Sequence, residues 1–210
     1  MMQEQTGLCL ATMALVEALS ARLGTLSYLW GGCALDAYEG RILRAHRDID
    51  YMTVGLAGLG PQFAALFREA GWEATWTPNA MVTARTEGIH IALGALDLGD
   101  EATWWDNGDL GYVRFPAAWL RPQPVDLDGV PVHVVEPEFE YMIKSRPRLL
   151  NPDWNLKEQH IAARERLREI LQARGVDPES LYPRVSHYTG CGARCPLHRR
   201  TASPASWPAR

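Results

Sequence analysis

Two adjacent glycines, Gly31 and Gly32, separate two short segments of different character. Residues 27–30 before them are apolar and aromatic and predict a strand, whereas residues 33–39 after them have a helix-compatible composition. The chain must therefore pass from a strand into a helix through two residues without side chains. Such a turn leaves backbone amides open at the positive end of the helix dipole, where phosphate groups bind. Taken alone, a glycine pair more often marks an ordinary loop.

The segments around this turn predict a sheet with flanking helices. Apolar residues at helical spacing predict a helix over residues 7–23, and residues 49–54 predict a second strand. Pro61 is expected at the first position of a further helix that ends at Gly71. Residues 72–115 alternate short β-prone pieces with turn residues, which indicates antiparallel pairing. The expected class is α+β with some α/β character, built on a mixed, largely antiparallel sheet.

The C-terminal part predicts a hairpin and two more helices. The Asp128-Gly129 pair is a two-residue hairpin signal between two β-prone segments. Pro137 is expected to open a helix that runs to about Lys144, and residues 155–173 predict a longer amphipathic helix.

We therefore expect a first domain over residues 1–136, a C-terminal helical part over 137–183 and a basic tail over 184–210. The tail contains five arginines and no acidic residue, a composition typical of a segment without stable structure.

Two thiols and two imidazoles lie close together in this tail: His187, Cys191, Cys195 and His198. These residue types can form a tetrahedral Zn²⁺ site. The alternative is a disordered tail with two free thiols.

Composition and charge leave a small-molecule partner as the default. The chain has 210 residues, 47% of them hydrophobic, and a formal net charge of -4, so no global field favours polyanions. No apolar run approaches the roughly 20 residues that cross a bilayer, and the N-terminus lacks the pattern of a signal peptide. We expect a cytoplasmic protein with no membrane partner, in which the sparse Cys9 and Cys33 stay reduced.

Two carboxylates flank Ile49 on the second predicted strand. Because side chains alternate along a strand, Asp48 and Asp50 are expected on one face and Ile49 on the other. Two neighbouring carboxylates repel each other, and a hard divalent cation such as Mg²⁺ relieves that repulsion. A pair of this kind on a strand is also common on solvated surfaces.

The order and spacing of these motifs carry a resemblance to a known family. The matching residues are the segment 29–36 with its Gly31-Gly32 pair, then Gly40, Arg41, Arg44, His46, Asp48, Ile49 and Asp50. This set resembles the small antibiotic nucleotidyltransferases of the lincosamide and aminoglycoside 2''-type. The resemblance implies a nucleotidyltransferase-type sheet followed by a C-terminal helical part. It also implies transfer of a nucleoside monophosphate from a Mg²⁺-bound triphosphate, with ATP the first candidate, to a hydroxyl of a small antibiotic-like acceptor.

The same resemblance assigns roles to individual residues. Gly31 and Gly32 hold phosphate, and Asp48 and Asp50 are catalytic and hold the metal. Further basic residues that could contact phosphate, orient the loop or lie near the acceptor are Arg41, Arg44, His46, Lys144 and Lys157. Each of these is equally consistent with a salt-bridged or solvated side chain.

A third carboxylate that such enzymes place on a neighbouring strand has no counterpart here. Alignment puts Ala92 at the position of the acid and Gly94 at that of a histidine that follows it. Strand alternation places Asp97 on the opposite face. His90 is the one titratable residue of this strand on the expected face, which makes it a candidate base or a histidine at a strand edge.

The sequence leaves three functions open. The first is an enzyme of this family, and the second is a catalytically degenerate relative that binds nucleotide but lacks the acid at position 92. The third is a nucleotidyltransferase acting on protein or tRNA, for which the basic tail would speak. Trp104 and Trp105 could stack on the acceptor or cap a core edge. Several nearby acidic residues would suit a cationic acceptor or form a solvated loop: Asp97, Asp100, Glu101, Asp106 and Asp109.

Overall fold

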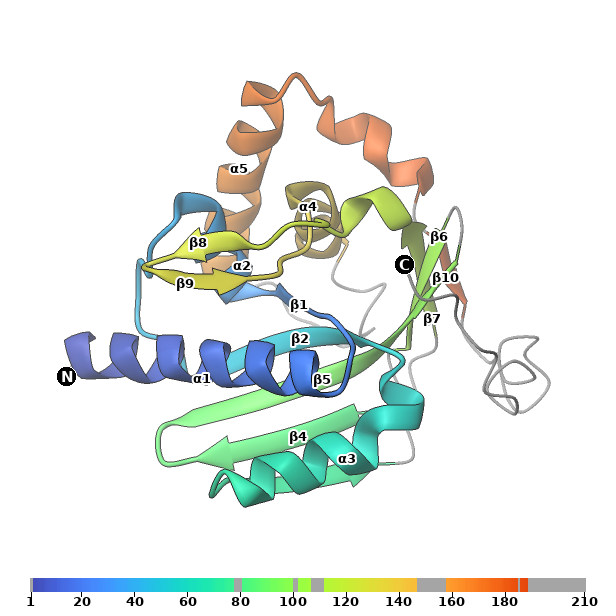
Figure 1. Cartoon of the computed structure of the whole chain (residues 1–210). Coiled ribbons are helices and arrows are strands. Elements are labelled where there is room, and N and C mark those ends of the chain that lie inside the picture. The colour runs from blue at the N-terminus through green and yellow to red at the C-terminus, as the bar shows by residue number, and fades with distance from the viewer. Residues whose placement is uncertain are drawn as a thin grey trace.

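The computed structural model describes residues 2–77, 81–99, 102–106, 112–146, 158–184 and 186–188 (Figure 1). The helices are α1 (Met2–Arg22), α2 (Gly32–Glu39), α3 (Leu56–Glu69), α4 (Pro137–Ser145) and α5 (Glu158–Ala173), with the 3-10 helices η2 (Ala117–Trp119) and η4 (Pro178–Arg184). The strands are β1 (Ser27–Trp30), β2 (Asp48–Val54), β3 (Glu73–Thr77), β4 (Met81–Thr86), β5 (Ile89–Leu98), β6 (Ala102–Asp106), β7 (Tyr112–Pro116), β8 (Val125–Leu127), β9 (Val130–Val132) and β10 (Ser186–Tyr188).

One mixed sheet organises these elements. Its order is β1-β2-β5-β6-β7-β10, and the β3-β4 hairpin joins β5 through β4. β2 and β5 run parallel because α3 and the β3-β4 hairpin separate them in the chain; the other pairings in this sheet are antiparallel. The predicted class, a mixed and largely antiparallel sheet with flanking helices, is confirmed.

The two faces of this sheet have different neighbours. Ile49 and Tyr51 of β2 are fully buried on the face that α1 and α3 cover. On the same face Thr53 shares a chain of hydroxyl hydrogen bonds with Ser27 of β1 and Ser20 of α1, with O–O distances of 2.8 and 2.7 Å. Alternation then directs Asp48 and Asp50 to the opposite face.

The C-terminal helices border that opposite face. α4 and α5 pack against each other, and both contact α2 (Figure 1). The β8-β9 hairpin packs against α1 and α2. The turn after β1 and the N-terminal end of β2, which carries Asp48 and Asp50, therefore lie beside the C-terminal helices.

Two helices begin earlier than the periodicity predicts. α1 starts at Met2 rather than near residue 7, because the Gln5 side chain in its first turns donates hydrogen bonds to the carbonyls of His46 and Gly88, at 2.7 and 3.1 Å. The prediction that Pro61 opens a helix is wrong. α3 starts at Leu56, whose side chain is fully buried, and contains Pro61. Tertiary burial outweighs the backbone bond that proline removes.

Two strands were not expected from the sequence. β6 includes Trp104 and Trp105 in a stretch whose acidic residues suggested a loop, yet it pairs with both β5 and β7. The expectation that the tail is unstructured from residue 184 fails for Ser186–Tyr188, which form β10 beside β7. Of the predicted zinc ligands, His187 belongs to this strand, whereas Cys191, Cys195 and His198 lie outside the described residues.

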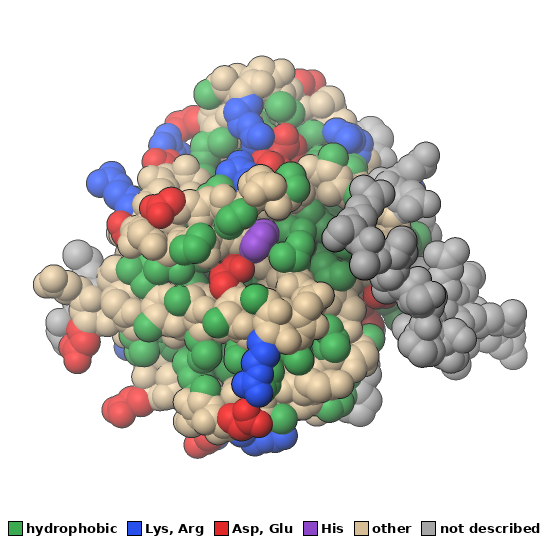
Figure 2. Space-filling view, viewed as in Figure 1, with side chains coloured by type: hydrophobic (Ala, Val, Ile, Leu, Met, Phe, Trp, Pro, Cys, Tyr) green, Lys and Arg blue, Asp and Glu red, His purple; other side chains and the backbone are tan. Residues whose placement is uncertain are grey.

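The helices, the surface charges and the buried cysteines complete the description of the fold. None of the helices in the described part of the chain is long and apolar enough to cross a bilayer. On the face shown in Figure 2, acidic and basic side chains are interspersed. Cys9 and Cys33 are free thiols in the core, and burial raises the pKa of both.

Candidate active site

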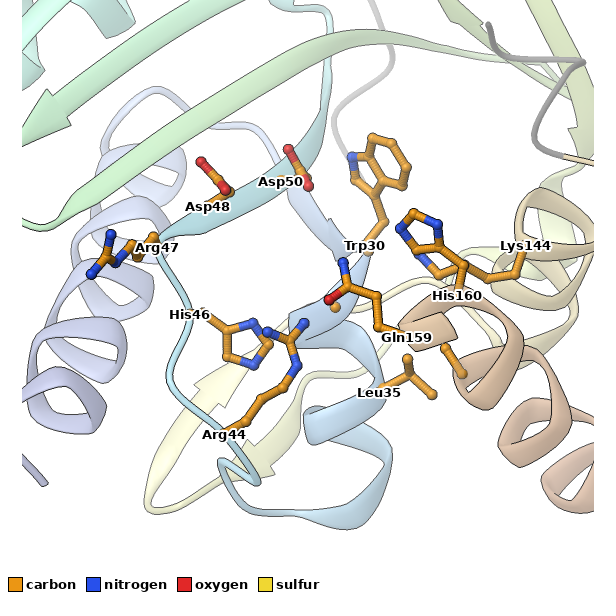
Figure 3. Close-up of a pocket in the computed structure, with 13 residues that line it drawn as sticks. Trp30, Leu35, Arg44, His46, Arg47, Asp48, Asp50, Lys144, Gln159 and His160 are labelled. Carbon is orange, nitrogen blue, oxygen red and sulfur yellow. The ribbon is translucent and has the colours of Figure 1, made fainter. Parts of the chain in front are cut away.

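A cleft of about 300 Å³ lies where β1, β2 and α2 meet the C-terminal helices (Figure 3). Its lining comprises Trp30, Gly31, Gly32, Leu35, Arg44, His46, Arg47, Asp48, Asp50, Lys144, Gln159, His160 and Ala163. The structure thus brings together the glycine turn, both carboxylates and basic side chains, from segments as far apart in the sequence as Gly31 and Lys144.

Asp48 and Asp50 leave the same side of β2, as the alternation predicts (Figure 3). The Asp48 side chain is 77% exposed, whereas Asp50 lies deeper. Burial raises the pKa of Asp50 to about 6. The Lys144 ammonium counteracts part of that rise in pKa, and the charges of Asp48 and Glu140 add to it. A divalent cation would remove the electrostatic penalty on this carboxylate pair.

The glycine turn is conformationally specific at both positions. Gly31 has φ +80° and ψ −144°, a conformation essentially confined to glycine, and a Cβ there would lie 3.1 Å from Asp50 Oδ2. A Cβ on Gly32 would lie 2.5 Å from Arg44 Nη2. Gly31 is therefore required by the backbone of the turn, whereas a side chain at position 32 would first have to displace the flexible end of Arg44.

The Gly31 amide has a partner that the sequence did not suggest. It donates a 2.5 Å hydrogen bond to Glu140 Oε1 of α4 instead of pointing freely into the cleft. Gly32, the first residue of α2, is at the N-terminal end of the helix dipole. The Gly31 amide could therefore bind phosphate only if its hydrogen bond to Glu140 broke. The phosphate role of Gly32 stays a prediction.

The predicted basic residues lie in different places relative to the cleft. Arg44 and Lys144 line the cleft, but Arg41 is exposed and does not. His46 is buried at the cleft wall, with Nε2 2.7 Å from Asp36 Oδ2, which also accepts the Leu43 N–H at 3.1 Å. His46 therefore orders the loop before β2. Lys157 lies outside the described residues.

Several cleft residues were missed by sequence reasoning. Arg47 immediately precedes the carboxylate pair, and Gln159, His160 and Ala163 come from one face of α5. The helical spacing of these three residues was a usable signal, because they share a face of the predicted amphipathic helix. Which element this face contacts could not be read from spacing.

The strand register confirms that position 92 is the neighbour of Asp50. β2 and β5 pair Asp50 with Ala92 and Asp48 with His90. His90 Nδ1 lies 3.7 Å from Asp48 Oδ1, and its side chain is 48% exposed. Among the residues that the structure describes, no group of three or more His, Cys, Asp or Glu side chains is arranged to hold a metal ion. The site has two carboxylates where the family pattern has three.

Trp105 occupies the space beside position 94. An ideal Cβ on Gly94 would lie 2.7 Å from its Nε1. The Trp105 side chain is buried and packs edge-on against Trp30, with ring centroids 4.8 Å apart, and against Phe139 at 6.2 Å. Trp105 thus supports the cleft wall from behind, and Trp30 is the tryptophan that lines the cleft.

The chemistry of this arrangement is that of a polyanion bound together with a cation. Arg44, Arg47 and Lys144 bring positive charge to the lining of the cleft, and Asp48 and Asp50 bring hard oxygen donors. Neither set alone is diagnostic, but their juxtaposition at a helix N-terminus fits a metal-bound phosphate chain.

Comparisons with known proteins agree with this geometry. No curated protein sequence matches the chain. Among solved structures, the solution structure of the antibiotic-resistance factor ANT(2'')-Ia has a TM-score of 0.67 at 18% identity, covering 94% of this chain and 95% of that one. The crystal structure of ANT(2'')-Ia in complex with adenylyl-2''-tobramycin has a TM-score of 0.63 at 20% identity, covering 85% and 95%. Lincomycin-bound LnuA, a lincosamide antibiotic adenylyltransferase, has a TM-score of 0.54 at 18% identity, covering 74% and 93%.

These likenesses establish a shared fold. The sequence itself also matches the family model described as aminoglycoside-2''-adenylyltransferase over residues 12–145, which include the glycine turn, both carboxylates and Lys144. The chain belongs to the aminoglycoside-2''-adenylyltransferase family.

Proposed function

We propose that this protein is a Mg²⁺-dependent nucleotidyltransferase. It would move a nucleoside monophosphate, with ATP as the first candidate donor, to a hydroxyl of a small antibiotic-like acceptor. Nucleotidyl transfer to an antibiotic is the activity of its relatives, since ANT(2'')-Ia is crystallised with adenylyl-2''-tobramycin and LnuA with lincomycin. The observation that carries the proposal is the placement of Asp48 and Asp50 on one side of β2, facing a cleft with Arg44, Arg47 and Lys144.

The donor set fits the cation. Mg²⁺ prefers oxygen ligands and is usually held by one or two carboxylates together with substrate phosphates. Burial raises the pKa of Asp50 to about 6, and the Lys144 charge counteracts only part of that rise, to which Asp48 and Glu140 add. This balance supports a cation beside Asp50. When bound, the ion would neutralise charge on the phosphates of the donor.

Residues of this chain would bind the triphosphate and accept the proton of the hydroxyl. Arg44, Arg47 and Lys144 would bind the triphosphate, with the α2 N-terminus at Gly32 contributing its dipole. The acceptor oxygen would form a bond to the α-phosphorus while the bond to the pyrophosphate breaks, and the hydroxyl proton must leave. In the absence of an acid at position 92, His90 is the titratable side chain of β5 nearest to Asp48, and we assign it the proton.

The second candidate function is nucleotide binding without turnover. Ala92 favours it, because the acid beside Asp50 is replaced by a methyl group. A protein of this kind would bind a nucleoside triphosphate but release no pyrophosphate with any acceptor.

One experiment separates the candidates. The purified protein is incubated with Mg²⁺, each of the four labelled ribonucleoside triphosphates, and in turn an aminoglycoside, a lincosamide and tRNA. Labelled antibiotic with equimolar pyrophosphate supports the proposal. Label on tRNA or on protein supports a nucleotidyltransferase that acts on macromolecules instead. Bound but unreacted nucleotide supports a relative that binds nucleotide without turnover.

A further inference from the structure

Glu140 is a fully buried carboxyl group on α4 that does not itself line the cleft. Its Oε1 accepts the Gly31 N–H at 2.5 Å, and its Oε2 lies 3.5 Å from the Lys144 ammonium one helical turn further on. A buried carboxylate is costly unless it is paired and hydrogen-bonded. Here Oε1 is hydrogen-bonded to the glycine turn, whereas Oε2 has the ion pair with Lys144 and no hydrogen bond within the described part of the chain.

The Lys144 ammonium interacts with carboxylates on two elements, Glu140 on α4 and Asp50 on β2. It lines the cleft with Asp48 and Asp50, and its charge counteracts the burial of Asp50. Its ion pair in the described part of the chain is nevertheless with Glu140. The Lys144 side chain is only 9% exposed, so water cannot screen its charge well.

We propose that Glu140 is a positioning residue that holds the Lys144 ammonium away from Asp50 and fixes the Gly31 turn with the same carboxyl group. Asp50 then stays available to a divalent cation, while Lys144 stays available to the triphosphate. The inference rests on the proposed function, because it takes Asp48 and Asp50 as the cation ligands.

The consequence of removing the charge at position 140 follows from electrostatics. A Glu140→Gln side chain keeps an oxygen that accepts the Gly31 N–H, but it no longer attracts the ammonium. Among the described residues, Asp50 is then the carboxylate that still interacts with the Lys144 charge. In a poorly screened site, this attraction places the ammonium in direct competition with the cation.

The probe for this competition is Mn²⁺ alone, counted by electron paramagnetic resonance in the full chain without nucleotide. Glu140→Gln should weaken Mn²⁺ binding by about tenfold or more, a change of about 1.4 kcal/mol per factor of ten. The double variant Glu140→Gln, Lys144→Met should regain the wild-type affinity, because the competing ammonium is gone. Glu138→Gln on the same helix, whose native partner is Arg174, is the matched control and should bind Mn²⁺ as the wild type does.

A merely structural role predicts a different pattern. It would lower the melting temperature in both variants that lack Glu140, and removing Lys144 would not rescue Mn²⁺ binding. Failure of that rescue therefore overturns the inference. If Glu140→Gln alone does not fold, the double variant is compared with Lys144→Met: equal Mn²⁺ affinity supports the inference, and weaker binding by the double variant contradicts it.

Asp50→Asn separates failure of this inference from failure of the proposed function. If the wild type binds no Mn²⁺, or Asp50→Asn binds it equally well, the proposed metal site is wrong and the role of Glu140 falls with it. If the wild type binds through Asp50 and Glu140→Gln binds equally well, the positioning role alone is wrong.

Discussion

Asp50 pairs with Ala92 across the parallel strands β2 and β5, so a half-buried carboxylate has a methyl group as its neighbour. At this position the chain departs from the three-carboxylate pattern of its family. The pairing also defines where the missing group can be restored.

Ala92→Asp should increase nucleotide transfer by at least about tenfold, because a third carboxylate beside Asp50 adds a ligand and proton acceptor at the reacting centre. Without Mg²⁺ the same change should lower the free energy of unfolding by about 1–3 kcal/mol through like-charge repulsion. Product formation and urea denaturation with and without Mg²⁺ measure both effects. Ala92→Asn, which has the same shape without the charge, should show neither the faster transfer nor the loss of stability from charge repulsion. An unchanged rate in Ala92→Asp contradicts the prediction.

Asp50→Asn should stabilise the metal-free protein while removing its activity. The folded-state pKa of Asp50 is raised from its ordinary value of 3.8 to about 6. Its contribution to stability is therefore fully present below pH 4 and is lost as the pH rises through 6. A shift of this size corresponds to about 3 kcal/mol at neutral pH, so Asp50→Asn should recover up to about that amount at pH 7.5 and little at pH 4.

The matched control for this measurement is Asp48→Asn. Its carboxylate is largely exposed, so we expect no comparable gain in the free energy of unfolding at pH 7.5. Chemical denaturation in a chelator at the two pH values tests the contrast. Equal behaviour of the two variants would mean that burial does not govern the pKa of Asp50.

Gly31→Ala should destabilise the protein by about 1–3 kcal/mol, because φ +80° strains any residue with a Cβ. That Cβ would also lie 3.1 Å from Asp50 Oδ2 and so disturb the carboxylate pair. Gly7→Ala in α1 is the control, since no atom outside its local helix lies within 4 Å of the added Cβ. It should leave stability unchanged or raise it by up to about 1 kcal/mol. Thermal melts of both variants decide the comparison.

Local signals predicted the part of the site that is continuous in sequence. The strand, glycine turn and helix around Gly31, and the alternation of Asp48 with Asp50, depend on residues within a few positions of each other. Their arrangement in the structure agrees with those predictions. The parallel register of Asp50 with Ala92 also agrees with the alignment to the family pattern.

The remainder depended on contacts between distant segments. Nothing near Gly31 in the sequence indicates that its amide bonds to Glu140, 109 residues away. Likewise, the early start of α3 reflects burial of Leu56 against the core, which outweighs the local preference of Pro61. β6 escaped prediction because the acidic residues around it suggested a loop, although Thr103, Trp104 and Trp105 favour a strand. Its pairing with β5 and β7 completes the strand.

Adenylyl transfer to an antibiotic is measured by mass spectrometry of an aminoglycoside incubated with the protein, Mg²⁺ and ATP, with pyrophosphate quantified in the same reaction. We expect an antibiotic heavier by one adenylyl group and one pyrophosphate for each product. In both Asp48→Asn and Asp50→Asn we expect the rate of product formation to fall by roughly two orders of magnitude or more. Product formation at the wild-type rate in both variants would contradict this expectation.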